Sequence, residues 1–121
     1  MLDGVCDRRT RVRGLAAIAA GNPPDIAKTF IMLFLDTAPA MLKDLETGAA
    51  QGDTQLLHRA SHTLKSSSIA VGARVLSRHC EQLERLARAG SVVDAATRVQ
   101  DIEERYREAA AALRAWCMAL E

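Results

Sequence analysis

The strongest constraint on the fold is an apolar repeat in the last quarter of the chain. Apolar residues recur there in alternating steps of four and three, at Ala95, Val99, Ile102, Tyr106, Ala109, Leu113, Trp116 and Leu120. Such steps place side chains on one face of an α-helix, because about 3.6 residues make one turn. A long helix with a single apolar face needs other helices to cover that face. The repeat therefore predicts a helical bundle.

Three more helices are predicted upstream, over residues 25–47, 53–71 and 73–89. They are bounded by breaks rich in glycine and proline, at residues 21–24, 48–52, 72 and 90–91. Asp53 or Thr54 can cap the second of these helices. The first is expected to bury a stripe made of Ile26, Phe30, Leu33, Phe34, Met41 and Leu45. Four amphipathic helices with short connections predict an all-α, antiparallel up-and-down four-helix bundle.

The length and composition fit one small helical domain. Of the 121 residues, 49% are apolar but only 3% are aromatic, which favours packed helices over a sheet. We expect residues 25–121 to form the bundle and residues 1–24 to form a lead-in or short helix. Because each helix can bury its apolar face within the bundle, a monomer is the expected state.

The charge distribution and the cysteines restrict the setting. A net charge of +1 gives no argument for nucleic acid or for an anionic membrane, and no apolar run reaches the roughly 18 residues that span a bilayer. Residues 53–90 carry six basic and three acidic side chains, which favours a partner with an acidic site. Three cysteines without disulfide or zinc spacing fit a reducing cytoplasm.

One histidine stands out on the second predicted helix. Leu57, Leu64 and Val71 share one side of that helix, and His62 falls on the opposite side, facing water. A neutral, accessible imidazole can accept and donate a phosphoryl group. Lys65 follows at i+3 on the same side and can offset the phosphoryl charge.

The residues around His62 complete a candidate site. Ser66, at i+4, is small and leaves room for another protein to approach. The second ring nitrogen of His62 needs an acceptor that fixes the tautomer, and Glu84, beside the apolar stripe of the next helix, is the candidate.

These residues carry a resemblance to a known family. They are His62-Thr63-Leu64-Lys65-Ser66-Ser67-Ser68, Val71-Gly72-Ala73, Leu76 and Cys80-Glu81-Gln82-Leu83-Glu84. At this spacing the chain resembles the histidine-containing phosphotransfer (HPt) domains of phosphorelays over residues 25–120, with a motif core at 58–88. The resemblance implies a four-helix bundle whose histidine shuttles phosphate between receiver-domain aspartates. It also implies that Lys65 balances phosphate charge and that Glu84 supports the imidazole by a hydrogen bond.

The same resemblance implies the partners. These are receiver domains of response regulators and, where the chain is the last domain of a longer protein, a hybrid sensor histidine kinase. The expected docking face consists of Arg59, Ser66, Ile69, Arg74 and Arg78. Transfer requires Mg²⁺, which the acidic pocket of the receiver supplies, so we expect no cofactor and no metal in this chain. Ser66 departs from the family, which usually has glycine at this position.

The sequence allows three other interpretations. His58 and His62 have metal-ligand spacing, and His79 and Glu84 could complete a zinc site, but the His-Glu-x-x-His arrangement is absent. A histidine kinase dimerisation domain would have an acidic residue where Thr63 stands, followed by a proline. The sequence also contains no glycine-rich segment that could bind ATP, as a histidine kinase requires. The chain is therefore not expected to be an autonomous enzyme. A helical interaction module that regulates a partner without carrying phosphate stays open as the alternative.

Overall fold

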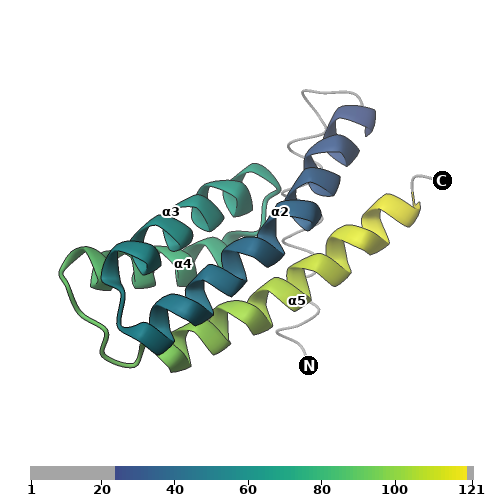
Figure 1. Cartoon of the computed structure of the whole chain (residues 1–121). Coiled ribbons are helices and arrows are strands. Elements are labelled where there is room, and N and C mark those ends of the chain that lie inside the picture. Colours follow the sequence, from purple (N-terminus) through teal and green to yellow (C-terminus); the bar gives the residue numbers. More distant parts are fainter. Residues whose placement is uncertain (1–23, 120–121) are drawn as a thin grey trace.

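The computed structural model describes residues 24–119, which form four α-helices (Figure 1). The helices are α2 (Pro24–Gln51), α3 (Thr54–Ala70), α4 (Arg74–Arg88) and α5 (Ala95–Ala119). No β-strand occurs within residues 24–119, and the predicted all-α four-helix bundle is confirmed. The predicted lead-in falls outside the described residues, apart from Pro24, which begins α2.

Short connections make consecutive helices antiparallel, and each helix packs against its neighbour in the chain. The bundle closes where α2 packs against α5. The two longest helices, α2 and α5, extend together beyond α3 and α4 at the end that holds the start of α2 (Figure 1). Across the part of the chain that the structure describes, no helix has the length and apolar character that crossing a bilayer requires.

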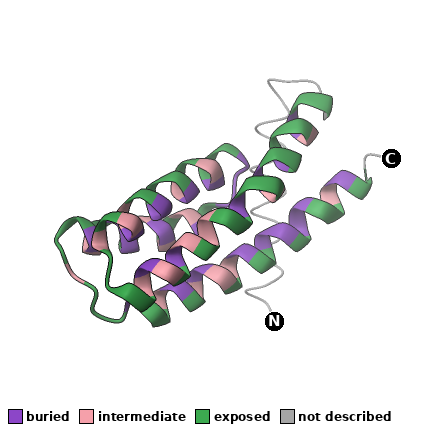
Figure 2. Cartoon of the chain, in the orientation of Figure 1, coloured by how far each residue is buried: buried purple, intermediate pink, exposed green. Residues whose placement is uncertain are grey.

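The core agrees with the predicted apolar faces of α3 and α5. Figure 2 shows the buried residues on the sides of the helices that face one another. The α5 repeat is buried from Ala95 to Leu113, Trp116 is partly buried, and Leu120 lies outside the described residues. Phe34 of α2 and Tyr106 of α5 place their ring centroids 5.7 Å apart, which joins the two long helices. The Cys80 thiol is free and buried, and burial raises its pKa to about 12, so it behaves as a small apolar group.

The predicted apolar stripe of α2 is wrong along its first half. Ile26, Phe30 and Leu33 are 40%, 45% and 57% exposed. The buried residues of this helix are Ala27, Ile31, Phe34, Ala38 and Leu45, and Met41 is half-buried against them. Two adjacent faces of this helix are both apolar, and the face containing alanines is the one buried. The exposed stripe lies on the part of α2 that extends past α3 and α4 (Figure 1).

The end of α2 falls within the predicted break at residues 48–52, because the helix continues through Gly48 to Gln51. Gly48 is buried, and a Cβ atom there would lie 2.9 Å from Cγ of Leu57 on α3. This glycine therefore permits a close approach of α2 and α3. The chain turns at Gly52 instead, where φ is +64°.

Replacement of Gly48 by valine tests this close contact. We expect Gly48→Val to lower the free energy of unfolding by about 2 kcal/mol, because the added atoms force Leu57 and the backbone of α3 to move. Urea unfolding followed by circular dichroism measures the change. Ala50→Val is the matched control on the exposed side of the same turn, with an expected cost of about 0.5 kcal/mol. Equal losses in the two variants would contradict the role given to Gly48.

Two carboxyl groups meet between α2 and α5. Burial raises the pKa of Glu103, and a hydrogen bond with Glu46 raises it further, while Arg107 acts in the opposite direction. Because the folded state raises the pKa of Glu103, the contribution of this group to stability is fully present below its ordinary pKa of 4.5. That contribution is lost as pH rises through the raised pKa. At neutral pH the pair is therefore destabilising.

Glu103→Gln should consequently raise the melting temperature by about 2 °C at neutral pH, since one charge of the pair is removed. The gain should shrink as pH falls from neutral through the raised pKa of Glu103, because protonation of Glu103 removes the same charge. Thermal unfolding across this pH range checks it, with Glu104→Gln on the exposed side of α5 as the control. A gain that is independent of pH would contradict the raised pKa of Glu103.

Candidate functional site

The site is centred on His62, in the third turn of α3. Its side chain is 56% exposed, and Nδ1 lies 2.7 Å from Oε2 of Glu84 on α4. Glu84 is only 3% exposed. A carboxylate oxygen accepts a hydrogen bond, so Nδ1 of His62 carries the proton and donates it. The tautomer is thereby fixed, and Nε2 retains the lone pair that a nucleophile needs.

The ends of α3 hold this histidine in place. Asp53, one of the two predicted capping residues, caps the helix, because its side chain accepts a hydrogen bond of 3.1 Å from the backbone N–H of Leu56. At the other end Gly72 has φ +76°, and the backbone N–H of Ala73 donates to the carbonyl of Ser68 over 2.8 Å. The helix that presents His62 is thus closed at both ends.

Glu84 is the buried centre of the site. The Nζ of Lys65 donates to its Oε1 over 2.6 Å, and an Nη of Arg88 donates to Oε2 over 3.3 Å. Burial alone would raise the pKa of Glu84, but the hydrogen bonds from Lys65 and His62 outweigh burial and lower it. Glu84 is therefore ionised at neutral pH and can hold the Nδ1 proton of His62.

Two predicted site residues make contacts that the sequence did not indicate. Lys65 is only 21% exposed and binds the carboxylate of Glu84. The Oγ of Ser66 donates to the backbone carbonyl of His62 over 3.2 Å. Ser66 therefore lies one turn beyond His62 on the exposed side of α3, with its hydroxyl turned back to the helix.

The residues predicted for the docking face are all exposed. Arg59, Ser66 and Ile69 lie on α3, where Ile69 is 59% exposed, and Arg74 and Arg78 lie on the first two turns of α4. Because α3 packs against α4, these positions belong to two adjacent helices.

Sequence reasoning missed two neighbours of Glu84. His58 was weighed only as a zinc ligand, yet its Nε2 lies 3.8 Å from Oε2 of Glu84 and is buried without a hydrogen bond. Its ring is nearly parallel to that of His62, at 14° and 6.3 Å between centroids. Arg88 reaches Glu84 from the next turn of α4, and the i, i+4 spacing of this pair was the available signal.

The zinc alternative finds no support in the described part of the chain. Within residues 24–119, no group of three or more histidine, cysteine, aspartate or glutamate side chains is arranged to hold a metal ion. His58 and His62 contact the same glutamate, but His79 does not join them.

A helical bundle that presents one histidine, with Nδ1 held by a buried carboxylate and Nε2 open, has the features of a domain that carries phosphate on histidine. The family model of the Hpt domain matches residues 29–116. The chain belongs to the Hpt domain family. It is accordingly a phosphorelay intermediate that acts by histidine phosphotransfer, and its partners are receiver domains of response regulators.

A solved structure has the same fold. The structure is that of the histidine-containing phosphotransfer protein B (HptB) from Pseudomonas aeruginosa PAO1, with a TM-score of 0.81 at 23% sequence identity. The match covers 88% of this chain and 92% of that one. No curated protein matches the chain in sequence.

Proposed function

We propose that His62 is the residue that carries the phosphoryl group and that Nε2 is its nucleophilic atom. The observation that carries this proposal is the 2.7 Å hydrogen bond from Nδ1 to Glu84. In the forward step Nε2 attacks the phosphorus of a receiver aspartyl phosphate. The N–P bond forms, the bond from phosphorus to the aspartate oxygen breaks, and the aspartate leaves as a carboxylate. The reverse step delivers the group to a second receiver.

Glu84 and Lys65 have supporting roles in this proposal. The Nδ1 proton stays in place during transfer, so the phosphorylated imidazole bears a positive charge that ionised Glu84 stabilises. Lys65 keeps Glu84 ionised through its bond to Oε1 and places a cation three residues beyond the phosphorylated side chain. Lys65 thus has two roles, since it offsets the charge of the phosphoryl group and also holds Glu84.

The receiver supplies the rest of the chemistry. We propose that it docks on Arg59, Ser66, Ile69, Arg74 and Arg78, and that Mg²⁺ belongs to its own acidic pocket. The chain then acts as a carrier and needs a partner for each step, so it is not an enzyme on its own. A hybrid sensor kinase as one partner, a monomeric state and a cytoplasmic setting remain parts of this proposal.

Incubation with a phosphorylated receiver domain and Mg²⁺ tests the proposal. We expect label to enter the protein in a form that is acid-labile and base-stable, as a phosphohistidine is, and to leave when a second receiver is added. A complex with the receiver that forms without any transfer of label would instead identify an interaction module.

A further inference from the structure

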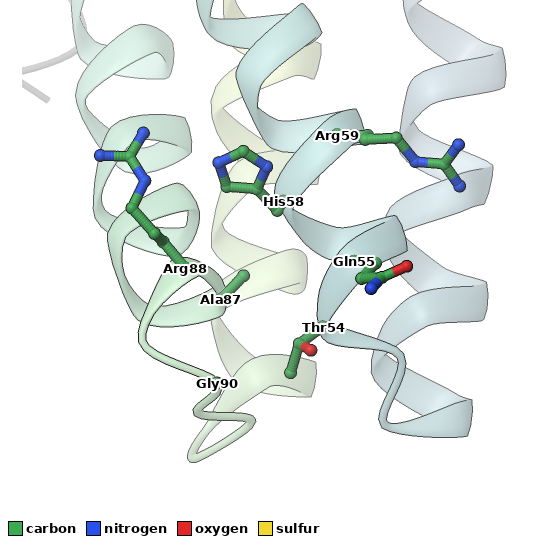
Figure 3. Close-up of a pocket in the computed structure, with 7 residues that line it drawn as sticks. All are labelled: Thr54, Gln55, His58, Arg59, Ala87, Arg88 and Gly90. Atoms are coloured by element: carbon green, nitrogen blue, oxygen red, sulfur yellow. The ribbon is translucent and has the colours of Figure 1, made fainter.

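A recess of about 560 Å³ opens one turn from His62, between the start of α3 and the end of α4. Thr54 and Gln55 line it from α3, Ala87 and Gly90 lie at its α4 side, and His58 stands between the two helices (Figure 3). None of the residues that line the recess is acidic. The small side chains on the α4 side leave it large enough to admit a whole side chain.

Two arginines flank this recess. Figure 3 shows Arg88 extending from α4 on the side of His58, whereas Arg59 extends from the other side of α3. Arg88 is 67% exposed, yet its guanidinium is anchored, since one of its nitrogens donates to Glu84. A guanidinium has five N–H groups, and no other acceptor for those of Arg88 is found within residues 24–119.

An anchored arginine of this kind is suited to one ligand class. Its planar fork matches a carboxylate in a bidentate geometry. Since Glu84 already orders the side chain, less entropy is lost when a ligand binds. The imidazole of His58 adds a second polar group at the recess, and Arg59 adds positive charge at its rim.

We propose that this recess binds an acidic side chain of the receiver domain that docks over His62, with Arg88 as the main contact, and that it selects among receivers. The inference rests on the proposed function and deepens it. Arg59 belongs to both the recess and the predicted docking face, whereas the main contact, Arg88, lies outside that face. Charge complementarity identifies the occupant, because two arginines and no acid line the recess, and Glu84, which Arg88 contacts, is already bound to Lys65 and His62.

Transfer kinetics with several phosphorylated receiver domains test the proposal. For the receivers that the recess selects, Arg88→Glu should raise KM roughly tenfold to hundredfold, as expected when a charge-assisted hydrogen bond is lost. The KM of Arg88→Lys should fall between those of the wild type and Arg88→Glu, since lysine keeps the positive charge but lacks the planar guanidinium. Reversal of one acidic side chain on the receiver to lysine should restore KM with Arg88→Glu. The matched control is Arg114→Glu on the exposed side of α5, which makes the same change in net charge.

Labelling by phosphoramidate separates docking from chemistry, because this small donor needs no docked receiver. A rise in KM for the selected receivers that exceeds any change in the phosphoramidate labelling rate of Arg88→Glu supports the recess as a docking site. Slowed labelling, with an equal loss for all receivers, would mean that Arg88 acts only through Glu84 and would overturn the proposal. A shift of the nuclear magnetic resonance signals of His58 with inorganic phosphate, together with an unchanged KM in Arg88→Glu, would identify the recess as a small-anion site. That result would also overturn the proposal. Failure of wild-type labelling by every donor would reject the proposed function itself.

Discussion

Replacement of His62 by glutamine is expected to abolish phosphoryl transfer, with a loss of more than roughly a thousandfold in rate, because the nucleophile itself is removed. Glutamine cannot form a stable N–P bond, although it keeps a polar side chain at an exposed position. Since Glu84 retains Lys65 and Arg88, the free energy of unfolding should change by less than about 1 kcal/mol. Transfer from a phosphorylated receiver and urea unfolding measure the two quantities.

The chain provides two matched controls for this variant. His58→Gln removes the neighbouring imidazole on α3, and His79→Gln removes the histidine on α4. Both should still accept label. The Nε2 of His58 is buried against Glu84, so it cannot serve as an alternative nucleophile for a docked receiver. Label that persists in His62→Gln and disappears in either control would place the site elsewhere.

Loss of Glu84 should have the second largest effect. In Glu84→Ala, Nδ1 of His62 loses its acceptor, and Lys65 and Arg88 lose their shared anion. We expect transfer to slow by roughly tenfold to hundredfold, as when an outer partner that orients a histidine is removed. The free energy of unfolding should fall by about 2 kcal/mol, because a half-buried ammonium group is left unpaired.

The stability effect of Glu84 should depend on pH. The folded state lowers the pKa of Glu84, so its contribution is present above the ordinary value of 4.5 and is lost as pH falls through the lowered value. Unfolding measured from neutral pH to about pH 3 should therefore show a loss in the wild type that Glu84→Gln lacks. The control is Glu81→Ala, one turn earlier, where an exposed pair with Arg85 is worth less than about 0.5 kcal/mol. Equal stabilities of Glu81→Ala and Glu84→Ala would contradict the account.

The sequence predicted the parts of the fold that follow from local pattern. The α5 repeat, the Asp53 cap and the exposed face of His62 all depend on residues within a few turns, where helical periodicity decides which side each residue takes. Periodicity failed where it was ambiguous. Along the first half of α2 it favoured the large side chains of Ile26 and Phe30, whereas packing against a neighbouring helix selected the alanine-containing face.

The sequence named residues that the structure brings together around Glu84, but not all of their contacts. Glu84 was identified as the partner of His62, although 22 residues separate the two and only the packing of α3 on α4 fixes their distance. The hydrogen bond from Lys65 to Glu84 depends on the same packing. The sequence therefore indicated Lys65 only as a positive charge that offsets the phosphoryl group. The sequence indicated Gly48 only as part of the break at residues 48–52, because its contact with Leu57 exists only in the assembled bundle.

The central claim is that His62 carries phosphate on Nε2 while Glu84 holds the Nδ1 proton. Nuclear magnetic resonance of the ¹⁵N-labelled, phosphorylated protein tests it most directly, since coupling between phosphorus and nitrogen identifies the bonded atom. The account predicts a single phosphohistidine, at position 62, with phosphorus on Nε2 and a proton on Nδ1. Phosphorus on Nδ1 of His62, which would require the bond to Glu84 to break, or phosphorus on another residue would contradict the account.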